Sequence, residues 1–301
     1  MPLRIEGAID MHCHFGPDTI GGRMTGPPVI EGVEMKEVQH SVTGYEAAKE
    51  AYESGHKAIV LKSHSFCSCQ LASSLEQVVP GLRVLGGACT DYASGGLSVE
   101  TVESALQIGA KIIWLPTVNS TEDMARKHAD RYRGKPGIPV IDDSGEPTEL
   151  VQEIFSLVRE HDAVLATGHT NAAEHYAVVR EFAGQGKVLV THAGEAMAGP
   201  NLSVQQAKEL ADLGATIELT AECCVPLFNR PPKSHKVMAE MIDAIGHERC
   251  TLSSDYGWAT IVPKPAEGLK DFLEKLWEAG VSEDKLTRMV STNPARLLSI
   301  Q

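Results

Sequence analysis

Residues 5–14 read Ile-Glu-Gly-Ala-Ile-Asp-Met-His-Cys-His, and this stretch decides how the rest of the chain is interpreted. Phe-Gly-Pro-Asp follows at 15–18, and a mostly apolar run that stops at such residues is typical of a buried strand followed by a turn. The next regular stretch, 44–54, has Tyr45, Ala48 and Tyr52 at helical spacing. The chain therefore opens with a strand followed by a helix.

The same alternation continues along the sequence. Further β-branched apolar runs are separated by amphipathic stretches, several of which are followed by Gly, the usual residue after the end of a helix. The predicted strands are 5–14, 57–64, 82–91, 110–117, 163–169, 187–193, 215–222 and 250–257. The helix candidates are 44–54, 98–108, 148–161, 172–182, 203–213, 237–245 and 266–279.

Strict alternation of strand and helix implies parallel strands with right-handed crossovers, and strands that are apolar throughout are buried on both faces. Eight such units in 301 residues predict a single (β/α)8 TIM barrel domain over 1–301. Residues 118–147 form the largest interruption, an insertion after the fourth strand that carries a basic cluster and a hairpin-like segment. A doubly wound open sheet is the alternative, but no GxGxxG follows the first strand to support dinucleotide binding.

Composition narrows the functional classes. The formal charge of −13, from 27 Lys and Arg against 40 Asp and Glu, disfavours nucleic-acid and anionic membrane partners. No apolar run approaches the roughly 20 residues of a membrane-spanning helix, and the N-terminal residues do not resemble a secretory signal. The 7 Cys include no CxxC pair. We therefore expect reduced thiols, a cytoplasmic location and a small-molecule substrate, with a homo-oligomer possible.

The 12 His are unusual for where they fall. In a strand, residues i and i+2 point to the same side, so His12 and His14 both face inward and Cys13 faces away. The predicted strands that follow end in His169, in His192 and in Asp255. Because the carboxyl ends of parallel barrel strands meet at one rim, these side chains should converge there.

Imidazole nitrogens and a carboxylate at one depth form a donor set that suits Zn, with Fe, Mn or Ni as alternatives. Packing alone gives no reason to gather histidines at one rim. We therefore predict a divalent metal site, with one or two ions per chain, made by residues of separate strands.

The second strand adds Lys62 and His64 to the same face. Lys62 can anchor a substrate anion, pair with a buried carboxylate or, if carboxylated by CO2, bridge two ions. An ammonium beside a divalent cation is strongly disfavoured, which favours the carboxylated form or a neutral amine. His64 can bind substrate or simply end the strand.

Together these residues resemble the amidohydrolase superfamily of metal-dependent (β/α)8 enzymes. The resemblance rests on Ile9–His14, on His169 and His192, on Asp255 within Ser-Ser-Asp-Tyr-Gly, and on Ser-Thr-Asn-Pro-Ala-Arg-Leu-Leu at 291–298. It implies that His12, His14 and Asp255 hold one metal. It also implies that His169 and His192 belong to a second metal or, with a single ion, share ligand and proton-transfer roles.

One departure from the family concerns its bridging ligand. Members with two metals often bridge them by a Lys or Glu on strand four, whereas that strand here reads Ile-Ile-Trp-Leu-Pro-Thr at 112–117. Lys62 can substitute from strand two. Otherwise the site is mononuclear, and His192 becomes a base or a substrate contact.

The expected reaction follows from the ion, because coordination lowers the pKa of water from about 15.7 toward about 7 and polarises a carbonyl. Asp255 would orient that water and take its proton. The first prediction is therefore a metal-dependent hydrolase of an amide, cyclic amide or lactone bond. A mononuclear decarboxylase of the same superfamily and a non-catalytic metal-binding barrel are the alternatives. Arg23 and Tyr256 join His64 as candidate substrate contacts, and Glu195, Glu222, Arg230 and Trp258 lie near the same rim.

Overall fold

The computed structural model describes residues 6–18, 29–30, 33–34, 40–128, 132–227 and 231–300. Eight parallel strands form its centre, and each lies at a place where the sequence predicts one. The strands are β1 (Ile9–His14), β4 (Ala58–Lys62), β5 (Arg83–Cys89), β6 (Ile112–Trp114), β7 (Val164–Ala166), β8 (Lys187–Val190), β9 (Thr216–Thr220) and β10 (Cys250–Ser253). Their sheet order follows the sequence from β1 to β10.

The first and last strands meet just beyond β10, which brings the sheet close to a closed barrel. The backbone N–H of Asp255 donates to the carbonyl of His12, and that of His14 donates to the carbonyl of Tyr256. The donor–acceptor distance is 2.9 Å in both hydrogen bonds. Gly257 makes this approach possible, because a Cβ there would lie 1.9 Å from the carbonyl oxygen of His14. The predicted (β/α)8 barrel is confirmed, and the open doubly wound sheet is excluded.

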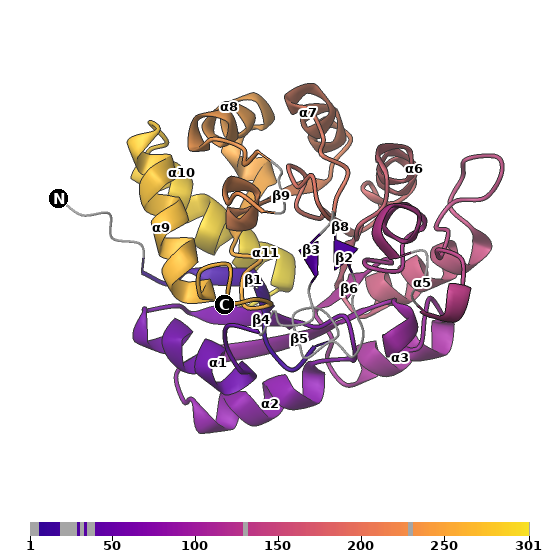
Figure 1. Ribbon diagram of the computed structural model, residues 1–301, viewed down its shortest axis with the longest axis horizontal. Helices are drawn as coiled ribbons and strands as arrows, with labels where there is room; N and C mark the ends of the chain where they lie inside the picture. The colour runs from indigo at the N-terminus through magenta and orange to yellow at the C-terminus, as the bar shows by residue number, and fades with distance from the viewer. Residues whose placement is uncertain are drawn as a thin grey trace.

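Helices surround the strands on the outside of the barrel (Figure 1). They are α1 (Gly44–Glu53), α2 (Cys69–Val78), α3 (Val99–Gln107), α4 (Thr121–Asp123), α5 (Glu149–Glu160), α6 (Ala172–Phe182), α7 (Val204–Asp212), α8 (His235–Ile245), α9 (Pro265–Glu278), α10 (Glu283–Thr287) and α11 (Asn293–Leu298). Six short helical segments accompany them: η1 (Tyr92–Ser94), η2 (Met124–His128), η3 (Tyr132–Gly134), η4 (Ala221–Cys224), η5 (His247–Arg249) and η6 (Arg288–Thr292).

Side-chain caps explain where several helices begin. Thr43, Asn171 and Ser203 each form a capping box at the start of α1, α6 and α7, which satisfies backbone N–H groups that the helix leaves unpaired. The sequence candidates include neither α2 nor the final helices α10 and α11. The helices α10 and α11 are short, with five and six residues, and only the π-helical turn η6 separates them, whereas α2 has ten residues.

A β-bulge in β1 determines which of its side chains face inward. Asp10 pairs with Ile59, but Cys13 pairs with Leu61, so β1 contains one more residue than β4 over this interval. Met11 consequently packs inside the barrel below His12, and Asp10 leaves the inner face. Simple alternation would have placed Asp10 on the same side as His12 and His14.

The interior below the bulge is an apolar plug. Side chains of the strands pack there with two leucines of α11, which close the end of the barrel opposite the histidines. The buried members are Ile9, Met11, Ala58, Val60, Leu85, Cys89, Ile112, Trp114, Val164, Ala166, Leu189, Leu297 and Leu298. This core stabilises the barrel and leaves its other end for polar groups.

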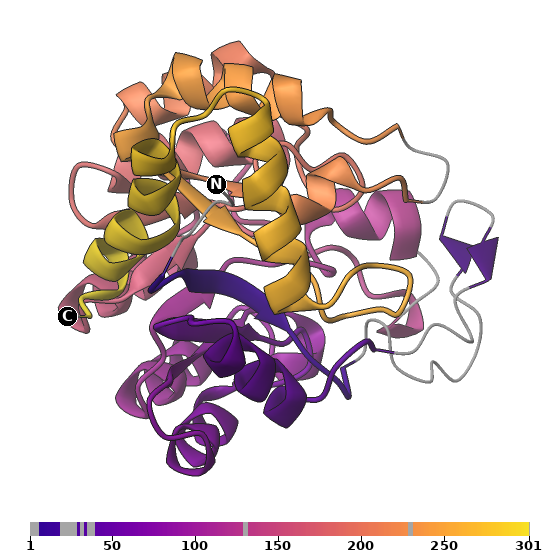
Figure 2. The same ribbon diagram turned by 90° about the vertical axis from the view of Figure 1, so that its left-hand side faces the viewer.

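Two long connections enter the rim at the carboxyl ends of the strands. The predicted insertion over 118–147 contains α4 and an antiparallel bridge between Ile141 and Pro147 around the turn at 142–145, as the hairpin-like sequence indicated. The connection from β1 to α1 contains the two-stranded sheet of β2 (Val29–Ile30) and β3 (Val33–Glu34), which Figure 2 shows set apart from the barrel. Among the described residues, no helix combines the length and apolarity that a bilayer span requires.

Candidate metal centre

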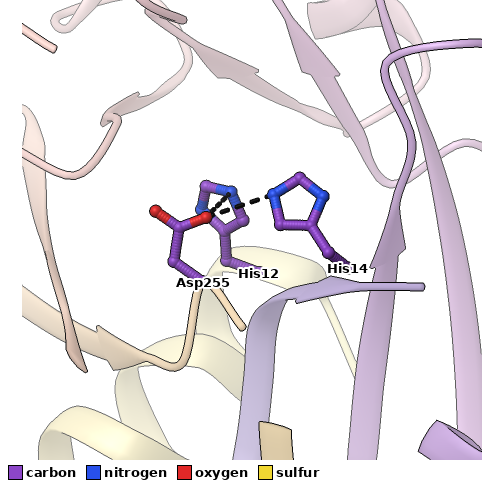
Figure 3. A group of neighbouring side chains, drawn as sticks. All are labelled: His12, His14 and Asp255. Atoms are coloured by element: carbon purple, nitrogen blue, oxygen red, sulfur yellow. Dashed lines mark hydrogen bonds and ion pairs between the residues drawn. The ribbon is translucent and has the colours of Figure 1, made fainter. Parts of the chain in front are cut away.

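His12, His14 and Asp255 converge at the carboxyl ends of β1 and β10 (Figure 3). One carboxylate oxygen, Oδ1 of Asp255, lies 2.9 Å from Nε2 of His12 and 3.1 Å from Nε2 of His14. The three residues are at most 4% exposed, and their candidate ligand atoms all lie within 4.8 Å of one another. Two imidazoles and a carboxylate in this arrangement form a donor set that can hold a divalent transition metal.

Electrostatics within this group are strongly coupled. Burial raises the pKa of Asp255, but the charge of His12 and the hydrogen bonds from both histidines outweigh burial and hold the pKa well below its usual range. Burial lowers the pKa of His12, yet the charge of Asp255 overcomes it and raises the pKa to about 9. Burial dominates at His14, whose pKa falls to about 3. The carboxylate of Asp255 therefore favours a positive charge on its neighbour His12, whereas burial disfavours one on His14.

Glu218 of β9 orients His12 from behind. Its Oε2 lies 3.1 Å from Nδ1 of His12 and accepts a hydrogen bond of 3.1 Å from the backbone N–H of His192. A carboxylate on Nδ1 holds the proton there and turns Nε2 toward the mouth, which is the common support of metal-binding histidines. Sequence reasoning missed Glu218, although a lone acid inside the apolar run Thr-Ile-Glu-Leu at 216–219 was the available signal.

Asp10 joins the two backbone segments that carry His12 and Asp255. Its carboxylate accepts the backbone N–H of His12 at 3.1 Å, the backbone N–H of Ser254 at 3.0 Å and the Ser254 hydroxyl at 2.5 Å. Asp10 is 1% exposed, and the bulge in β1 is what turns it toward Ser254. These hydrogen bonds of Asp10 hold together β1 and the end of β10, and so position the candidate ligands that the two strands carry.

His169 lies one turn beyond β7, and its Nδ1 lies 2.9 Å from Oδ2 of Asp123 on α4. His192 follows β8, and its ring centroid lies 4.8 Å from that of His169 and 5.6 Å from that of His12. Burial and the nearby His169 hold the pKa of His192 well below its usual value, so that its ring is neutral. The structure therefore brings both predicted histidines to the mouth, and Asp123 is a supporting residue that the sequence did not indicate.

The backbone at two candidate ligands is in the left-handed region. The φ angles are 25° at His192 and 58° at Asp255. Such angles are uncommon outside glycine and concentrate at functional sites, where the surrounding fold holds them in place. The turn from strand to loop thus aims both side chains back toward the barrel axis.

Lys62 is fully buried, and its Nζ lies 2.8 Å from Nε2 of His12. The same amine sits 5.5 Å above the ring of Trp114, the residue of β6 that occupies the strand where the family often has a bridging Lys or Glu. Lys62 therefore reaches the side chains of His12, His14 and Asp255 from β4, the second strand of the barrel, as predicted. Its carboxylation and its role as a metal ligand stay predictions.

His64 also reaches the mouth, stacked on His14 with ring centroids 5.1 Å apart. Its Nδ1 lies 2.7 Å from Oγ1 of Thr117, which in turn donates to Oδ2 of Asp91. Oδ1 of Asp91 accepts the backbone N–H groups of Thr117 and Asn119. His64, Cys89 and Asp91 lie close enough for a metal, and the hydrogen bonds through Thr117 account for the approach of His64 to Asp91.

The structure does not bring the remaining predicted contacts to this group. Arg23 and Arg230 fall outside the residues that the structure describes. Tyr256 is 3% exposed and packs on α9, where a Cβ at Gly268 would lie 2.3 Å from its ring. The substrate-binding role of Tyr256 therefore stays a prediction that its position does not favour.

A cavity of about 670 Å³ has Glu222 in its wall; Glu222 interacts with Asp255, although Asp255 itself does not line the cavity. Burial, followed by the charge of Asp255, raises the pKa of Glu222 well above its usual range, which favours the protonated carboxyl. The cavity wall is otherwise mixed, with apolar side chains and a few charged groups. Its members include Glu195, Met197, Cys223, Val225, Leu227, Pro231, Pro232, Lys233 and Val237.

A family model described as a family of unknown function, DUF6282, matches residues 7–218, which is more than half of the chain. The comparison with curated proteins gives no match. Among solved structures, an amidohydrolase from Pseudomonas aeruginosa is 13% identical, with 97% of this chain and 95% of that chain covered at a TM-score of 0.64.

Two further structures have related folds. The probable dipeptidase PvdM from Pseudomonas aeruginosa is 12% identical over 98% of this chain and 95% of its own, at a TM-score of 0.66. The 2,6-dihydroxybenzoate decarboxylase from Rhizobium is 11% identical over 98% and 99%, at 0.57. These likenesses confirm the resemblance to the amidohydrolase superfamily at the level of the fold.

Proposed function

We propose that this chain, which belongs to the DUF6282 family of unknown function, is a metal-dependent hydrolase of an amide, cyclic amide or lactone bond. The observation that carries the proposal is the convergence of His12 and His14 on one oxygen of Asp255 at the mouth of a (β/α)8 barrel. Active sites of this fold lie at the carboxyl ends of the strands, where these residues are.

The donor chemistry fits a divalent cation. Nδ1 of His12 faces Glu218 and Nδ1 of His169 faces Asp123, so both rings turn Nε2 toward the mouth. Oriented imidazoles with carboxylates behind them are typical of metal ligands, and a carboxylate among the ligands adds negative charge. We propose zinc first, with Mn, Fe or Ni as alternatives, because imidazole and carboxylate suit all four.

When bound, such a cation supplies Lewis acidity, which lowers the pKa of a water molecule and polarises a substrate carbonyl. Asp255 stays ionised because its pKa is held low, and it can orient that water and accept its proton. Glu222 lies beside Asp255 and carries a proton that can pass toward a leaving group. His192, a neutral ring 5.6 Å from His12, is the further candidate for ligand or proton transfer.

The cavity that Glu222 lines is the proposed binding place for the body of the substrate. Its volume of about 670 Å³ lies in the range of small-molecule sites, and its wall combines apolar side chains with Glu195 and Lys233. We therefore propose a small-molecule substrate. A cytoplasmic location and a homo-oligomer stay predictions.

A mononuclear decarboxylase is the second candidate. Trp114 on β6, the fourth strand of the barrel, favours it, because many two-metal relatives have a bridging side chain on that strand. The similar fold of the Rhizobium decarboxylase also favours it. A single ion held by His12, His14 and Asp255 would serve either reaction. A barrel that binds metal without turnover is the third outcome.

The test measures metal content and turnover in the same preparations. We expect wild-type protein, loaded with Zn²⁺ or Mn²⁺ and dialysed, to retain metal and to hydrolyse members of a panel of amides, lactams and lactones. His12→Ala and Asp255→Asn should lose both properties while the circular dichroism spectrum is unchanged. His161→Ala is the matched control, because His161 is exposed on the far end of α5.

The outcomes distinguish the three functions or reject the metal centre. Release of CO2 from a carboxylate panel, without hydrolysis, favours the decarboxylase. Bound metal with no turnover on either panel favours the non-catalytic barrel. Retention of metal by both variants at the wild-type level would reject the assignment of the centre itself.

A further inference from the structure

A second cavity lies on the outside of the barrel, between α9, the end of α1 and the residues that precede β1. Its volume is about 480 Å³, and none of the candidate metal ligands lines it. Figure 2 shows α9 and α1 on either side of β1. Ala8 and His56, which stand shortly before β1 and β4, place the cavity near the amino ends of these strands. It is therefore separate from the mouth, which lies at their carboxyl ends.

His56 is the buried polar side chain of this cavity. It is 8% exposed, and neither of its ring nitrogens makes a hydrogen bond of normal geometry among the described residues. Burial lowers the pKa of His56 against the charge of Asp10, so the ring is neutral at pH 7 and has one N–H and one lone pair to share. A buried polar group without a partner costs free energy. A cavity wall that contains one therefore indicates a ligand that forms hydrogen bonds.

The other buried side chains of the cavity wall are apolar. Ala8 precedes β1, and Ala266, Leu269 and Leu273 lie on one face of α9 at helical spacing. These four residues are at most 4% exposed. The lining part of α9 runs from Ala266 to Glu274, which corresponds to about 12 Å at 1.5 Å per residue. This wall suits a ligand with a short aliphatic chain.

The exposed edge of the cavity is acidic. Glu6, Glu53 and Glu274 line it, with Lys270 as the one cation among the lining residues. The side chains of Glu53 and Glu274 are 59% and 41% exposed, and they pair with Lys49 at 3.8 Å and with Lys270 at 4.0 Å. Such exposed ion pairs hold their carboxylates weakly. The edge therefore has a net negative charge that favours a cationic group of a ligand.

We propose that this cavity is a binding site for a small amino alcohol, in which a short aliphatic chain joins a primary amine to a hydroxyl group. The hydroxyl fits His56, because it can both donate and accept a hydrogen bond and so serves either tautomer of the neutral ring. The chain covers the apolar face of α9. The ammonium group stays at the acidic edge, where it keeps much of its hydration.

The same features exclude other simple ligands. An ammonium group placed against His56 would lose its hydration without gaining a carboxylate partner in the cavity wall, which disfavours the reverse orientation. An anionic ligand would face the carboxylates of Glu6, Glu53 and Glu274 at the edge. A purely apolar ligand would leave the nitrogens of His56 unpaired.

Isothermal titration calorimetry of the full chain with 5-amino-1-pentanol tests the proposal. Two matched probes accompany it: pentylamine lacks the hydroxyl, and 5-hydroxypentanoate has a carboxylate in place of the ammonium. We expect one molecule of 5-amino-1-pentanol per chain, pentylamine bound about 10-fold more weakly, and no detectable binding of 5-hydroxypentanoate. Absence of binding by 5-amino-1-pentanol, or equal affinities for it and either other probe, would overturn the proposal.

His56→Phe tests the contact with the hydroxyl, because it retains a flat ring and removes both nitrogens. It should weaken the binding of 5-amino-1-pentanol about 10-fold and leave that of pentylamine unchanged, since pentylamine has no hydroxyl to lose. His161→Phe, at the exposed end of α5, is the matched control. An equal loss for both probes in His56→Phe would show that the hydroxyl does not bind at this ring.

The double variant Glu53→Gln with Glu274→Gln tests the acidic edge. Both carboxylates are exposed, so this variant keeps the proposal testable if His56→Phe does not fold. It should weaken 5-amino-1-pentanol and pentylamine alike, by about threefold or more at low salt. Glu240→Gln is the control at an exposed position of α8. Unchanged affinities in the double variant would remove the ammonium group from this edge.

This site and the proposed function stand on different residues and different measurements. The calorimetric titration requires neither bound metal nor turnover. Failure of 5-amino-1-pentanol to bind therefore leaves the metal-dependent function intact, and failure to retain metal leaves the cavity beside His56 intact.

Discussion

The two ends of the barrel interior are built from the same strands but differ in composition: one end is apolar and the other is polar. Below the bulge of β1, Ile9 and Met11 pack with the other strands and with leucines of α11 in an apolar plug. Above it, His12 and His14 meet Asp255 in a buried polar group. The β-bulge in β1, one extra residue between Asp10 and Cys13, lies at the boundary between the apolar half and the polar half of the interior. The comparison teaches that stability and chemistry are divided along each strand rather than between elements.

The polar half needs support that the apolar half does not. Buried polar groups need partners, and three of the histidines at the mouth are backed by carboxylates: Glu218 behind His12, Asp123 behind His169, and Asp91 behind His64 through Thr117. The apolar plug is stabilised by burial alone. Variants in the two halves should therefore differ in what they change.

The largest effect is expected in the polar half. Asp255→Asn keeps the shape of the side chain but removes the charge that His12 and His14 share. We expect metal affinity to fall more than 100-fold, beyond the range typical of outer-shell changes. Competition with a chromophoric chelator measures it. An affinity within tenfold of wild type would remove Asp255 from the centre.

The apolar half should respond through stability instead. Leu298 is fully buried in the plug, and Leu298→Ala should lower the free energy of unfolding by about 2–5 kcal/mol. Metal content per folded chain should not change. Urea unfolding gives the stability, with Leu213→Ala as control because Leu213 is 43% exposed. A loss of metal in Leu298→Ala would mean that the two halves are not separable.

A buried histidine away from the mouth sharpens the contrast. His175 of α6 is hydrogen-bonded to Thr167 and Thr170, and burial lowers its pKa to about 4. The unfolded value is higher, near 6.5. The neutral His175 ring therefore contributes its full stabilisation above about pH 6.5. As the pH falls toward 4, the free energy of unfolding decreases by up to about 3 kcal/mol because the unfolded chain binds a proton at this histidine more readily.

The measurement compares wild type with His175→Gln at the same metal load. Urea midpoints between pH 7 and pH 4.5 should fall more steeply in wild type, because the variant lacks this titration. Parallel pH profiles in the two proteins would show that His175 is not the group concerned.

The smallest effect concerns the support of a ligand. Glu218→Gln can still accept the hydrogen bond of His12 but removes the charge behind it. We expect metal affinity to fall about 10- to 100-fold, with the fold intact. Glu240→Gln, on an exposed position of α8, is the matched control. An unchanged affinity in Glu218→Gln would show that the charge of this carboxylate does not act on the site.

Much of the architecture could be predicted because it depends on local pattern. The apolar runs gave the strands, and residues two apart in β1 placed His12 and His14 on one face. The final helices were missed because α10 and α11 are too short for a clear period. The sequence did not predict the role of Asp10, because only the bulge in β1 turns its side chain toward Ser254.

By itself, the sequence determined the barrel and the strand ends at which His12, His14, Lys62, His64, His169, His192 and Asp255 stand, because hydrophobic period and strand alternation are properties of neighbouring residues. Only the tertiary structure decided which of these side chains touch and which carboxylates stand behind them. Glu218 lies more than 200 positions from His12, and Asp91 acts on His64 through a third residue. Such pairs depend on register, bulges and closure of the sheet, which no local pattern encodes.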